Sequence, residues 1–336
     1  MRPFKLSAAY HWLLSAVLLS CLLMPRLAAA VGSCAQRPAA KPALTLLSAA
    51  MAQGRFVSYQ PTQIQIHQGK ATRADEAGIA ADLAVLRPRF DGLILYGALD
   101  GADRVVDVAA RLGFRAVILG VWNLDNAREL DLALAAAARQ PRLVVGLSLG
   151  NERVLAGATS MQALATRLQQ ARARAPQLLW TSTEPFHLFE QAAARPLLAQ
   201  MDFMLVNVHP VFQPWFRTAS DADAARFVVN VVNDMAAVYC GPVLVKETGV
   251  PTAPASMGFT AQRQAGFWRS LKIQFPPDPL RAFAFFSAFD APWRVTDEHP
   301  TAGSQPQEGS WGLYDAQRSP KTSARELAVL RARSTH

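Results

Sequence analysis

The sequence predicts a single-domain (β/α)8 barrel, and two observations favour that fold class. Eight continuous apolar runs alternate with amphipathic helical patterns between residues 55 and 330. Such alternation is typical of a parallel sheet whose strands are buried on both faces, with helices covering the outer face. Eight strands in roughly 280 residues fit a closed barrel better than an open sheet.

Each predicted strand is a short apolar run bounded by turn-forming residues. In chain order the strands cover residues 56–59, 93–96, 116–122, 143–150, 178–182, 203–208, 243–246 and 283–289. The helical patterns between them cover 75–87, 102–112, 126–139, 160–175, 222–239 and 260–275. A lead-in over 31–54 contains one further helix near 44–52, and the longest loop, 296–310, follows the eighth strand. No linker or repeat interrupts this pattern, so we expect one domain over 55–330.

Residues 1–30 have the pattern of a secretory signal peptide. Arg2 and Lys5 provide a positive start, residues 13–23 are apolar, and a run of alanines at 28–30 offers a small-residue cleavage site. The apolar stretch is short for a membrane span. We therefore expect a secreted or periplasmic protein with the segment cleaved, and an uncleaved N-terminal anchor is the alternative.

Charge and cysteine content restrict the partners. Removing residues 1–30 takes away three positive charges and lowers the formal net charge from +9 to +6. The remaining basic residues are scattered on helical patterns, so we expect no nucleic-acid partner, and we expect a monomer. Cys34 and Cys240 remain, without metal-ligand spacing, and both a disulfide and two free thiols are open interpretations. No metal or cofactor is expected.

Polar and aromatic residues collect where the predicted strands end. These positions are Tyr59, Tyr96, Trp122, Asn151, Glu152, Glu184, His209, Glu247, Asp290 and Trp293. In a barrel of this class the active site is built at the C-terminal ends of the strands. Aromatic rings interleaved with carboxylates suit sugar rings, so we predict a carbohydrate-binding mouth there.

Glu152 and Glu247 are the candidate catalytic residues. Each directly follows an apolar, β-branched run, and the two runs are predicted as the fourth and seventh strands. Two carboxyl groups facing each other at about 5 Å are the arrangement of a retaining glycosidase, in which one is the nucleophile and the other the acid/base. Asn151, beside Glu152, is placed to hydrogen-bond the sugar 2-hydroxyl.

A competing string, Gly146-Leu147-Ser148-Leu149-Gly150, fits the nucleophile elbow of serine hydrolases. That elbow requires a sharp turn at the serine with a helix following at once. Here Leu147 and Leu149 continue the strand alternation. A serine esterase using Ser148 is therefore only a remote alternative.

At these residues the chain resembles glycoside hydrolase family 17, the β-1,3-glucanase family. The matching strings are Gly150-Asn151-Glu152, Asn207-Val208-His209-Pro210, Lys246-Glu247-Thr248-Gly249-Val250-Pro251, Phe289-Asp290-Ala291-Pro292-Trp293-Arg294 and Glu308-Gly309-Ser310-Trp311-Gly312-Leu313-Tyr314-Asp315. The resemblance implies a retaining (β/α)8 enzyme acting on β-1,3-glucan, with Glu152 as acid/base and Glu247 as nucleophile. It places Glu308 in the same cleft and adds Arg294 to the expected substrate contacts.

Three departures from the family pattern concern the cleft. Val250 stands where the family has Trp or Tyr, Ala291 where it often has Glu, and Arg294 where it often has Lys. The strings around Glu184 and Phe212 are similar to those of bacterial members. These departures leave the reaction type in place but leave substrate length and cleavage position open. Two alternatives remain, a β-glucan transglycosylase and a glycan-binding barrel without turnover.

Overall fold

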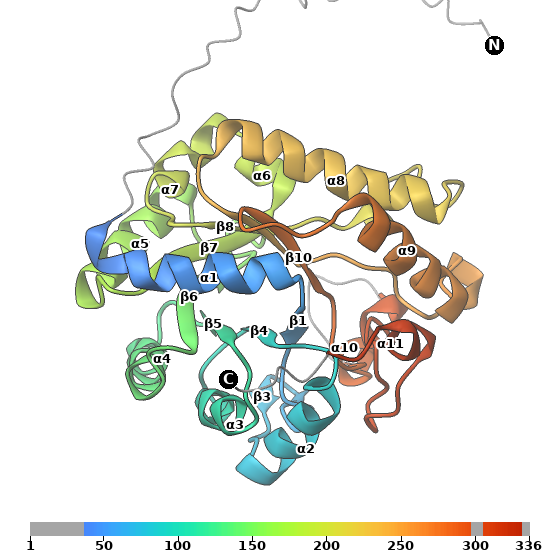
Figure 1. Cartoon of the computed structure of the whole chain (residues 1–336), viewed down its shortest axis with the longest axis horizontal. Helices are drawn as coiled ribbons and strands as arrows, with labels where there is room; N and C mark the ends of the chain where they lie inside the picture. The colour runs from blue at the N-terminus through green and yellow to red at the C-terminus, as the bar shows by residue number, and fades with distance from the viewer. Residues whose placement is uncertain (1–36, 297–304, 331–336) are drawn as a thin grey trace, which may run out of the picture. The chain divides into compact units, whose positions relative to one another are not determined.

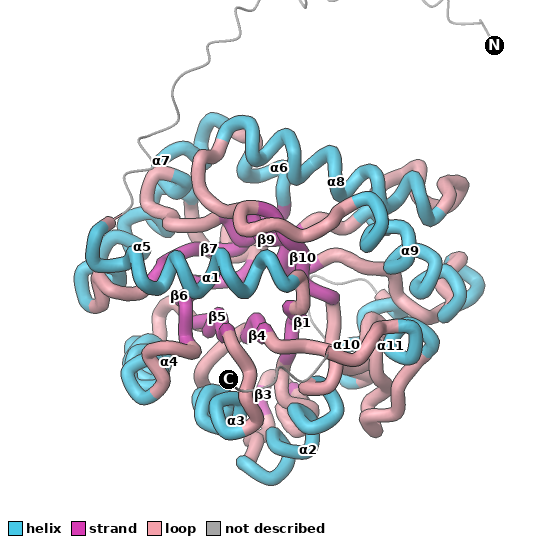
Figure 2. Tube along the Cα trace, viewed as in Figure 1, coloured by secondary structure: helices cyan, strands magenta, loops and turns pink. Residues whose placement is uncertain are grey.

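The computed structural model describes residues 37–296 and 305–330. Eight parallel strands close into a barrel in the order β1-β4-β5-β6-β7-β8-β9-β10, and β10 pairs with β1. Helices surround the strands (Figures 1 and 2). The predicted (β/α)8 class is therefore confirmed. The predicted signal peptide, 1–30, lies outside the described residues.

The barrel strands fall where the apolar runs predict them. They are β1 (Phe56–Tyr59), β4 (Gly92–Leu95), β5 (Ala116–Val121), β6 (Val144–Asn151), β7 (Leu179–Pro185), β8 (Met204–Asn207), β9 (Val243–Glu247) and β10 (Arg281–Phe285). The helices are α1 (Lys41–Gln53), α2 (Glu76–Leu86), α3 (Val105–Arg111), α4 (Ala127–Arg139), α5 (Met161–Arg174), α6 (Phe186–Phe189), α7 (Arg195–Leu198), α8 (Asp221–Val238), α9 (Ala261–Gln274), α10 (Trp293–Thr296) and α11 (Thr322–Glu326).

The main helices begin at side-chain caps that the sequence supplies. The caps are Asp75 for α2, Asn126 for α4, Ser160 for α5, Ser220 for α8 and Thr260 for α9. In each case the side-chain oxygen accepts a hydrogen bond from a backbone N–H of the first turn, which would otherwise lack a partner. These caps fix where each strand-to-helix loop ends at the barrel mouth.

Two parts of the fold differ from the sequence prediction. β10 ends at Phe285 rather than at residue 289, because the next residues bond mainly to the chain near Trp311: Ser287 N donates to Trp311 O, and Tyr314 N donates to Ala288 O. One bond to a barrel strand remains, from Ala288 N to Ser58 O of β1. A small hairpin, β2 (Ile66–His67) and β3 (Lys70–Ala71), also occupies the loop after β1. Strands of two residues are too short to show a period-2 pattern in the sequence.

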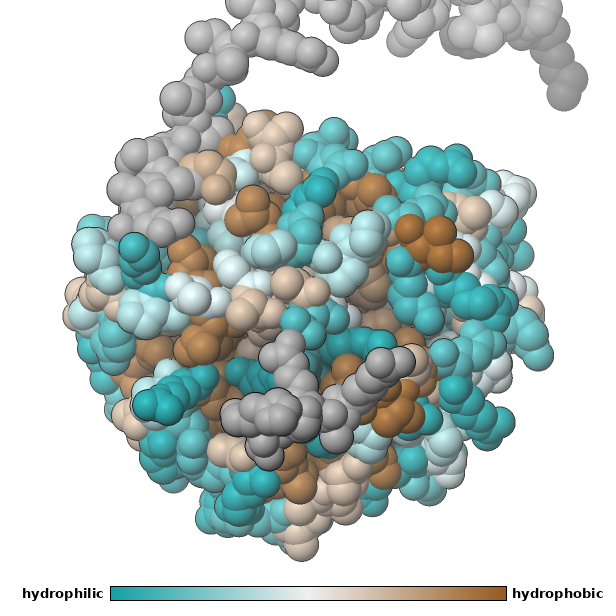
Figure 3. All heavy atoms as spheres, in the orientation of Figure 1, coloured by the Kyte–Doolittle hydropathy of each residue, from teal (hydrophilic) through white to brown (hydrophobic). Residues whose placement is uncertain are grey.

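Helix α1 closes the N-terminal end of the barrel. Leu47 and Met51 on this helix are fully buried and belong to one apolar cluster with strand residues such as Phe56, Ile118 and Leu244. In Figure 1 the helix crosses the strand ends, and Figure 3 shows polar and apolar residues interspersed on this face. The barrel interior is thus filled by side chains at this end, and a site must lie at the opposite, C-terminal end.

Strand residues alternate between the inside and the outside of the barrel. On β9, Leu244 belongs to the cluster that contains α1, whereas Val243 and Val245 belong to the cluster under the outer helices. This two-residue period decides which side chains of the regular part of each strand face the barrel mouth. The last residue of β9, Glu247, departs from it after a shift in the register between β8 and β9.

Two further features are the state of the cysteines and the character of the helices. Cys240 is disulfide-bonded, and the other two cysteines, Cys21 and Cys34, lie outside the described residues. Among residues 37–296 and 305–330, none of the helices has the length and apolar character needed to cross a membrane.

Candidate active site

Glu152 reaches the barrel mouth through an irregular end of β6. Gly150 and Glu152 both have positive φ, 76° and 53°, and the pairing of β6 with β7 shifts register between Ser148 and Asn151. A left-handed conformation is costly for a residue with a side chain and persists only where neighbours hold it. Here Glu152 N donates to Thr183 O at 2.8 Å.

The surroundings of Glu152 favour its protonated form. Its only hydrogen-bonding neighbour among the described side chains is Asn207, whose Nδ2 donates to Glu152 Oε1 at 2.8 Å. Burial raises the pKa of Glu152, and the negative charge of Glu247 raises it further; Asn207, His209 and Lys246 oppose the shift without cancelling it. A carboxyl group held protonated in this way is suited to donate a proton.

The surroundings of Glu247 favour its ionised form. Glu247 is the last residue of β9, is 6% exposed, and its Oε2 lies 3.5 Å from His209 Nε2. The Lys246 ammonium lies 3.8 Å from Glu247 Oε1. Burial by itself would raise the pKa of Glu247, but the His209 hydrogen bond and the charges of Lys246, His209 and Arg294 outweigh it and lower the pKa. An ionised, positioned carboxylate is what a nucleophile requires.

Lys246 is a buried cation between the two glutamates. Its side chain is 1% exposed, and its Nζ donates to Asn151 Oδ1 at 2.6 Å. Nζ also lies 4.2 Å from the centre of the Tyr96 ring. Burial lowers the pKa of Lys246 to about 8, while Glu247 and Glu152 act in the opposite direction. Lys246 was not among the residues expected to contact substrate. It lies two residues after the inward-facing Leu244 on the same strand, so the two-residue period could have placed it inside the barrel.

Aromatic rings form the walls around the carboxylates. The His209 ring makes edge contacts with Phe212, Phe286 and Trp311 at centroid distances of 5.4, 5.4 and 5.2 Å. Tyr96 and Trp122 meet edge to face at 6.5 Å, and Trp122 is 46% exposed. The predicted placement of Tyr96, Trp122 and His209 at the mouth agrees with these contacts.

A third carboxyl group, that of Glu308, lies near Trp311 and Arg294 at this mouth. Trp311 Nε1 donates to Glu308 Oε1 at 3.3 Å, and Arg294 Nη1 lies 3.9 Å from Glu308 Oε2. Trp293 lies under the Arg294 guanidinium, with 5.5 Å between its ring centre and the guanidinium carbon. One pocket is lined by Tyr96 together with these four residues. The structure thus brings the predicted Trp293, Arg294 and Glu308 to the same mouth.

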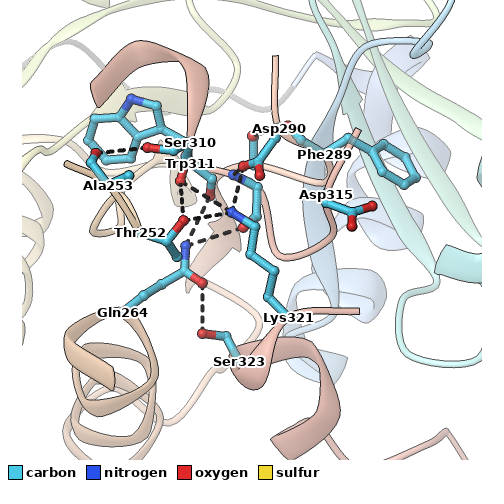
Figure 4. Close-up of polar contacts among 12 residues, drawn as sticks. Thr252, Ala253, Gln264, Phe289, Asp290, Ser310, Trp311, Asp315, Lys321 and Ser323 are labelled. Atoms are coloured by element: carbon cyan, nitrogen blue, oxygen red, sulfur yellow. Dashed lines mark hydrogen bonds and ion pairs between the residues drawn. The ribbon is translucent and has the colours of Figure 1, made fainter. Parts of the chain in front are cut away.

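Asp290 lines this pocket but its carboxylate is engaged in the fold. Lys321 Nζ donates to Asp290 Oδ1 at 2.6 Å and to Thr252 Oγ1 at 2.8 Å, and Gly312 N donates to Asp290 Oδ1 at 2.8 Å (Figure 4). Gln264 Nε2 in turn donates to Trp311 O at 3.2 Å. This network fixes the segment that carries Glu308 and Trp311. Asp290 thus helps to position this segment, and because it also lines the pocket, its contact with substrate stays a prediction.

Tyr59 and Glu184 do not contact the mouth, which corrects the sequence prediction. Both are 0% exposed. The Tyr59 hydroxyl donates to Asp82 of α2 at 2.8 Å, and Glu184 accepts hydrogen bonds from Val154 N at 2.8 Å and from Leu155 N at 3.1 Å. Both side chains occupy outward-facing positions in the strand alternation. Glu184 therefore fixes the loop that follows Glu152 rather than binding a sugar.

Ser148 is not arranged as a nucleophile. It lies within β6, is 2% exposed, and its hydroxyl is 3.2 Å from Thr183 Oγ1. No histidine is among its hydrogen-bond partners in the described part of the chain. The esterase alternative requires such a base, so this geometry argues against it.

Several buried polar atoms at the mouth lack a hydrogen-bond partner among the described residues. They are the Tyr96 hydroxyl, Asn207 Oδ1, His209 Nδ1 and Glu247 Oε1. Two of these groups act on one another, since the Glu247 carboxylate helps to raise the pKa of the buried Tyr96 hydroxyl. Buried polar groups in native proteins are almost always paired, so the remaining hydrogen-bonding capacity at the mouth is available to a ligand. A hydroxyl-rich ligand such as a sugar has the donors and acceptors to satisfy them.

A barrel mouth with two carboxylates of opposite protonation preference, walled by aromatic rings, defines a glycoside hydrolase. Residues 57–312 match the BtgE/BtgC glycoside hydrolase domain, and the chain belongs to that family. It is 23% identical to the glucan 1,3-beta-glucosidase of Arthroderma benhamiae over 268 residues, which covers 74% of this chain and 85% of the relative.

Solved structures give the same fold. The glycoside hydrolase family 17 beta-1,3-glucanosyltransferase from Rhizomucor miehei superposes with a TM-score of 0.61 at 20% identity, covering 82% of this chain and 97% of that one. An endo-laminarinase from Formosa Hel1_33_131 has a TM-score of 0.65 at 17% identity, covering 81% and 86%. At these identities the similarity establishes the barrel fold.

Proposed function

We propose that this glycoside hydrolase is a retaining enzyme of family 17, of the bacterial type, that cleaves β-1,3-linked glucan. The observation that carries the proposal is the contrast between two glutamates at one mouth, Glu152 with a raised pKa and Glu247 with a lowered pKa. The curated relative is named as a glucan 1,3-beta-glucosidase, and both solved structures are named for β-1,3-glucan or laminarin chemistry. The ordered family 17 strings supply the remaining support.

In the proposed reaction, Glu247 attacks the anomeric carbon while Glu152 protonates the oxygen of the leaving sugar. The glycosidic C–O bond breaks as the C–O bond to Glu247 forms, and the departing chain leaves with the Glu152 proton. Glu152, now ionised, takes a proton from a water molecule while the water oxygen attacks the anomeric carbon. The bond between that carbon and Glu247 breaks, so Glu247 is again ionised and Glu152 is again protonated. The product released first, before mutarotation, therefore has the same anomeric configuration as the substrate.

Product analysis on laminari-oligosaccharides of graded length tests this function. The expected result is cleavage of β-1,3-glucan with the β-anomer appearing first in NMR spectra of the fresh product, and far slower cleavage of β-1,4-glucan. Initial release of the α-anomer would contradict retention. Absence of turnover on every β-glucan would favour the glycan-binding alternative.

Transfer to a second sugar is a second candidate, favoured by one observation. Phe212 is 55% exposed and its ring contacts His209 and Trp311, so it offers an apolar platform beside the catalytic pair. A platform of this kind can hold an acceptor sugar in place of water. Products longer than the substrate at high laminaritriose concentration would support transfer, and their decrease in Phe212→Ala would assign the acceptor site to this ring.

We further propose that the protein is exported and that residues 1–30 are removed. N-terminal sequencing of protein from culture medium or periplasm is expected to start near Val31. Recovery of Met1 from the membrane fraction would support the anchor alternative.

A further inference from the structure

We propose that Lys246 is a positioning residue that fixes the orientation of the Asn151 side-chain amide toward the sugar 2-hydroxyl. The inference rests on the proposed glycosidase function and extends it. It adds a polar relay that runs from Lys246 through Asn151 and the 2-hydroxyl to Glu247. The starting observation is the contact of 2.6 Å between Lys246 Nζ and Asn151 Oδ1 at the barrel mouth.

The direction of this contact is set by chemistry. A lysine ammonium has only donors, so the Asn151 atom that faces it must be the carbonyl oxygen. An asparagine amide elsewhere can present its oxygen or its nitrogen to a neighbour, and the two orientations have nearly the same shape. With Lys246 present, only one orientation of Asn151 makes a hydrogen bond.

The amide nitrogen of Asn151 is consequently the group left for the ligand. No hydrogen bond in the described part of the chain uses Asn151 Nδ2, and Asn151 is partly exposed at the mouth. An N–H donor from Asn151 binds the oxygen of the 2-hydroxyl and leaves the hydroxyl proton free. That proton has an acceptor at the same mouth, because Glu247 Oε1 is buried and has no hydrogen-bond partner among the described residues, although the Lys246 ammonium lies 3.8 Å from it.

The opposite orientation of the amide would break this relay. If Asn151 presented its oxygen to the sugar, the 2-hydroxyl proton would bond to Asn151 and not to Glu247. Glu247 Oε1 would then remain an unsatisfied buried acceptor, which is costly. Contacts to the 2-hydroxyl strengthen in the transition state of glycoside cleavage, so the loss would appear mainly in catalysis.

Lys246 is held rigidly enough to act in this way. Its backbone oxygen accepts a hydrogen bond from Ser58 Oγ at 2.6 Å, and its side chain is 1% exposed. The charged and titratable groups that act on its ammonium are Glu247, Glu152 and Arg294, and the Tyr96 ring lies beneath it. A buried cation among these groups has few alternative positions.

The test measures the contribution of the 2-hydroxyl with and without Lys246. An aryl β-laminaribioside is compared with the analogue that lacks the 2-hydroxyl on the sugar next to the aryl group. The ratio of the two kcat/KM values is determined for the wild type, Lys246→Met and Lys246→Gln, with folding checked by circular dichroism and melting temperature. The intrinsic reactivity of the analogue cancels when ratios are compared between variants.

We expect the preference for the 2-hydroxyl substrate to fall by about tenfold in Lys246→Met, the size expected for loss of one charge-assisted contact. In Lys246→Gln, whose amide retains a donor, the fall should be smaller. In an Asn151→Ala background the preference should already be lost, and adding Lys246→Met should not change it further. An unchanged preference in a folded Lys246→Met enzyme overturns the proposal.

A matched control is Lys321→Met, which removes another buried lysine at the same end of the barrel. Lys321 is 15% exposed and pairs with Asp290 rather than with Asn151. It is expected to lower the melting temperature without altering the 2-hydroxyl preference. If the wild type does not act on the laminaribioside at all, the proposed function fails. If the wild type is active and Lys246→Met has the same 2-hydroxyl preference as the wild type, only the relay is rejected.

Discussion

The ends of β6 and β9 carry the same side chain in opposite electrostatic settings. Glu152, after β6, has one neutral amide donor, Asn207, and a raised pKa. Glu247, at the end of β9, has His209 and Lys246 beside it and a lowered pKa. Glu247 is buried and Glu152 is partly buried, and burial acts to raise the pKa of both, so burial does not explain their difference. The neighbouring groups explain it, and they give the two glutamates the opposite pKa shifts that the proposed acid and nucleophile require.

Removing the β9 carboxylate should have the largest effect. Glu247→Ala is expected to lower kcat by more than about 10⁴-fold, as for other catalytic nucleophiles, because no glycosyl-enzyme intermediate can form. Added azide should then attack the open anomeric face and give a glycosyl azide of inverted configuration. The measurement is turnover with and without azide, and retained activity without azide would remove Glu247 from this role.

Removing the β6 carboxyl should have an effect that depends on the leaving group. In Glu152→Ala the loss of general acid help is expected to slow glucan cleavage by about 10²–10⁴-fold. A dinitrophenyl β-glycoside needs little protonation, so its glycosylation rate should change much less. Pre-steady-state rates on both substrates provide the measurement. Equal losses on the two substrates would mean that Glu152 only binds or positions the sugar.

Asn207, whose side-chain amide donates a hydrogen bond to Glu152, should influence the pH at which activity falls on the alkaline side of the profile. Asn207 donates to the ionised form of Glu152 and so lowers its pKa. In Asn207→Ala that pKa should rise, and the alkaline limb of kcat/KM should move to higher pH, with activity at the optimum falling by about tenfold for the lost contact. Asn233→Ala, on an exposed part of α8, is the matched control. A limb that moves to lower pH contradicts this account of Glu152.

The smallest effect concerns Glu184, the carboxyl group that holds the loop after Glu152. Burial raises its pKa to about 7, above the ordinary 4.5. The folded state therefore keeps a proton that the unfolded state has lost, and the free energy of unfolding should fall as the pH rises from about 4.5 to about 7, by about 1–3 kcal/mol.

Glu184→Gln cannot ionise, so this part of the pH dependence should disappear, as measured by urea unfolding across that range. Glu190→Gln, at an exposed position, is the control and should retain the dependence. An identical pH dependence in the wild type and in Glu184→Gln would show that Glu184 is not the titrating group.

The barrel and the positions of Glu152 and Glu247 at its mouth were predictable because both leave short, regular patterns in the sequence. Buried parallel strands require apolar runs, and a carboxylate directly after such a run stands out, as Glu152 and Glu247 do. The side on which a strand-end residue projects was harder to predict. Tyr59 and Tyr96 both end predicted strands, but Tyr59 points outward to Asp82 while Tyr96 lies over Lys246.

Counting alternation from an inward residue separates such cases within a regular strand. It assigns Tyr59 and Glu184 to the outside and Lys246 to the inside. It cannot be extended through the irregular end of β6, where Gly150 and Glu152 have positive φ. It also fails at the end of β9, where it would place Glu247 outside, because the pairing with β8 shifts register just before Glu247. The bond between Asn207 and Glu152 joins residues 55 positions apart and depends on the closed barrel, so no local pattern predicts it.

The assignment of nucleophile and acid to the two strand ends is the central claim, and trapping the intermediate tests it most directly. A 2-deoxy-2-fluoro laminaribiosyl fluoride forms a slowly hydrolysed glycosyl-enzyme because the fluorine destabilises the transition state. Peptide mapping by mass spectrometry of the inactivated enzyme should place the label on Glu247, in the peptide that contains Lys246 and Thr248. A label on Glu152 or on Glu308 would contradict the account.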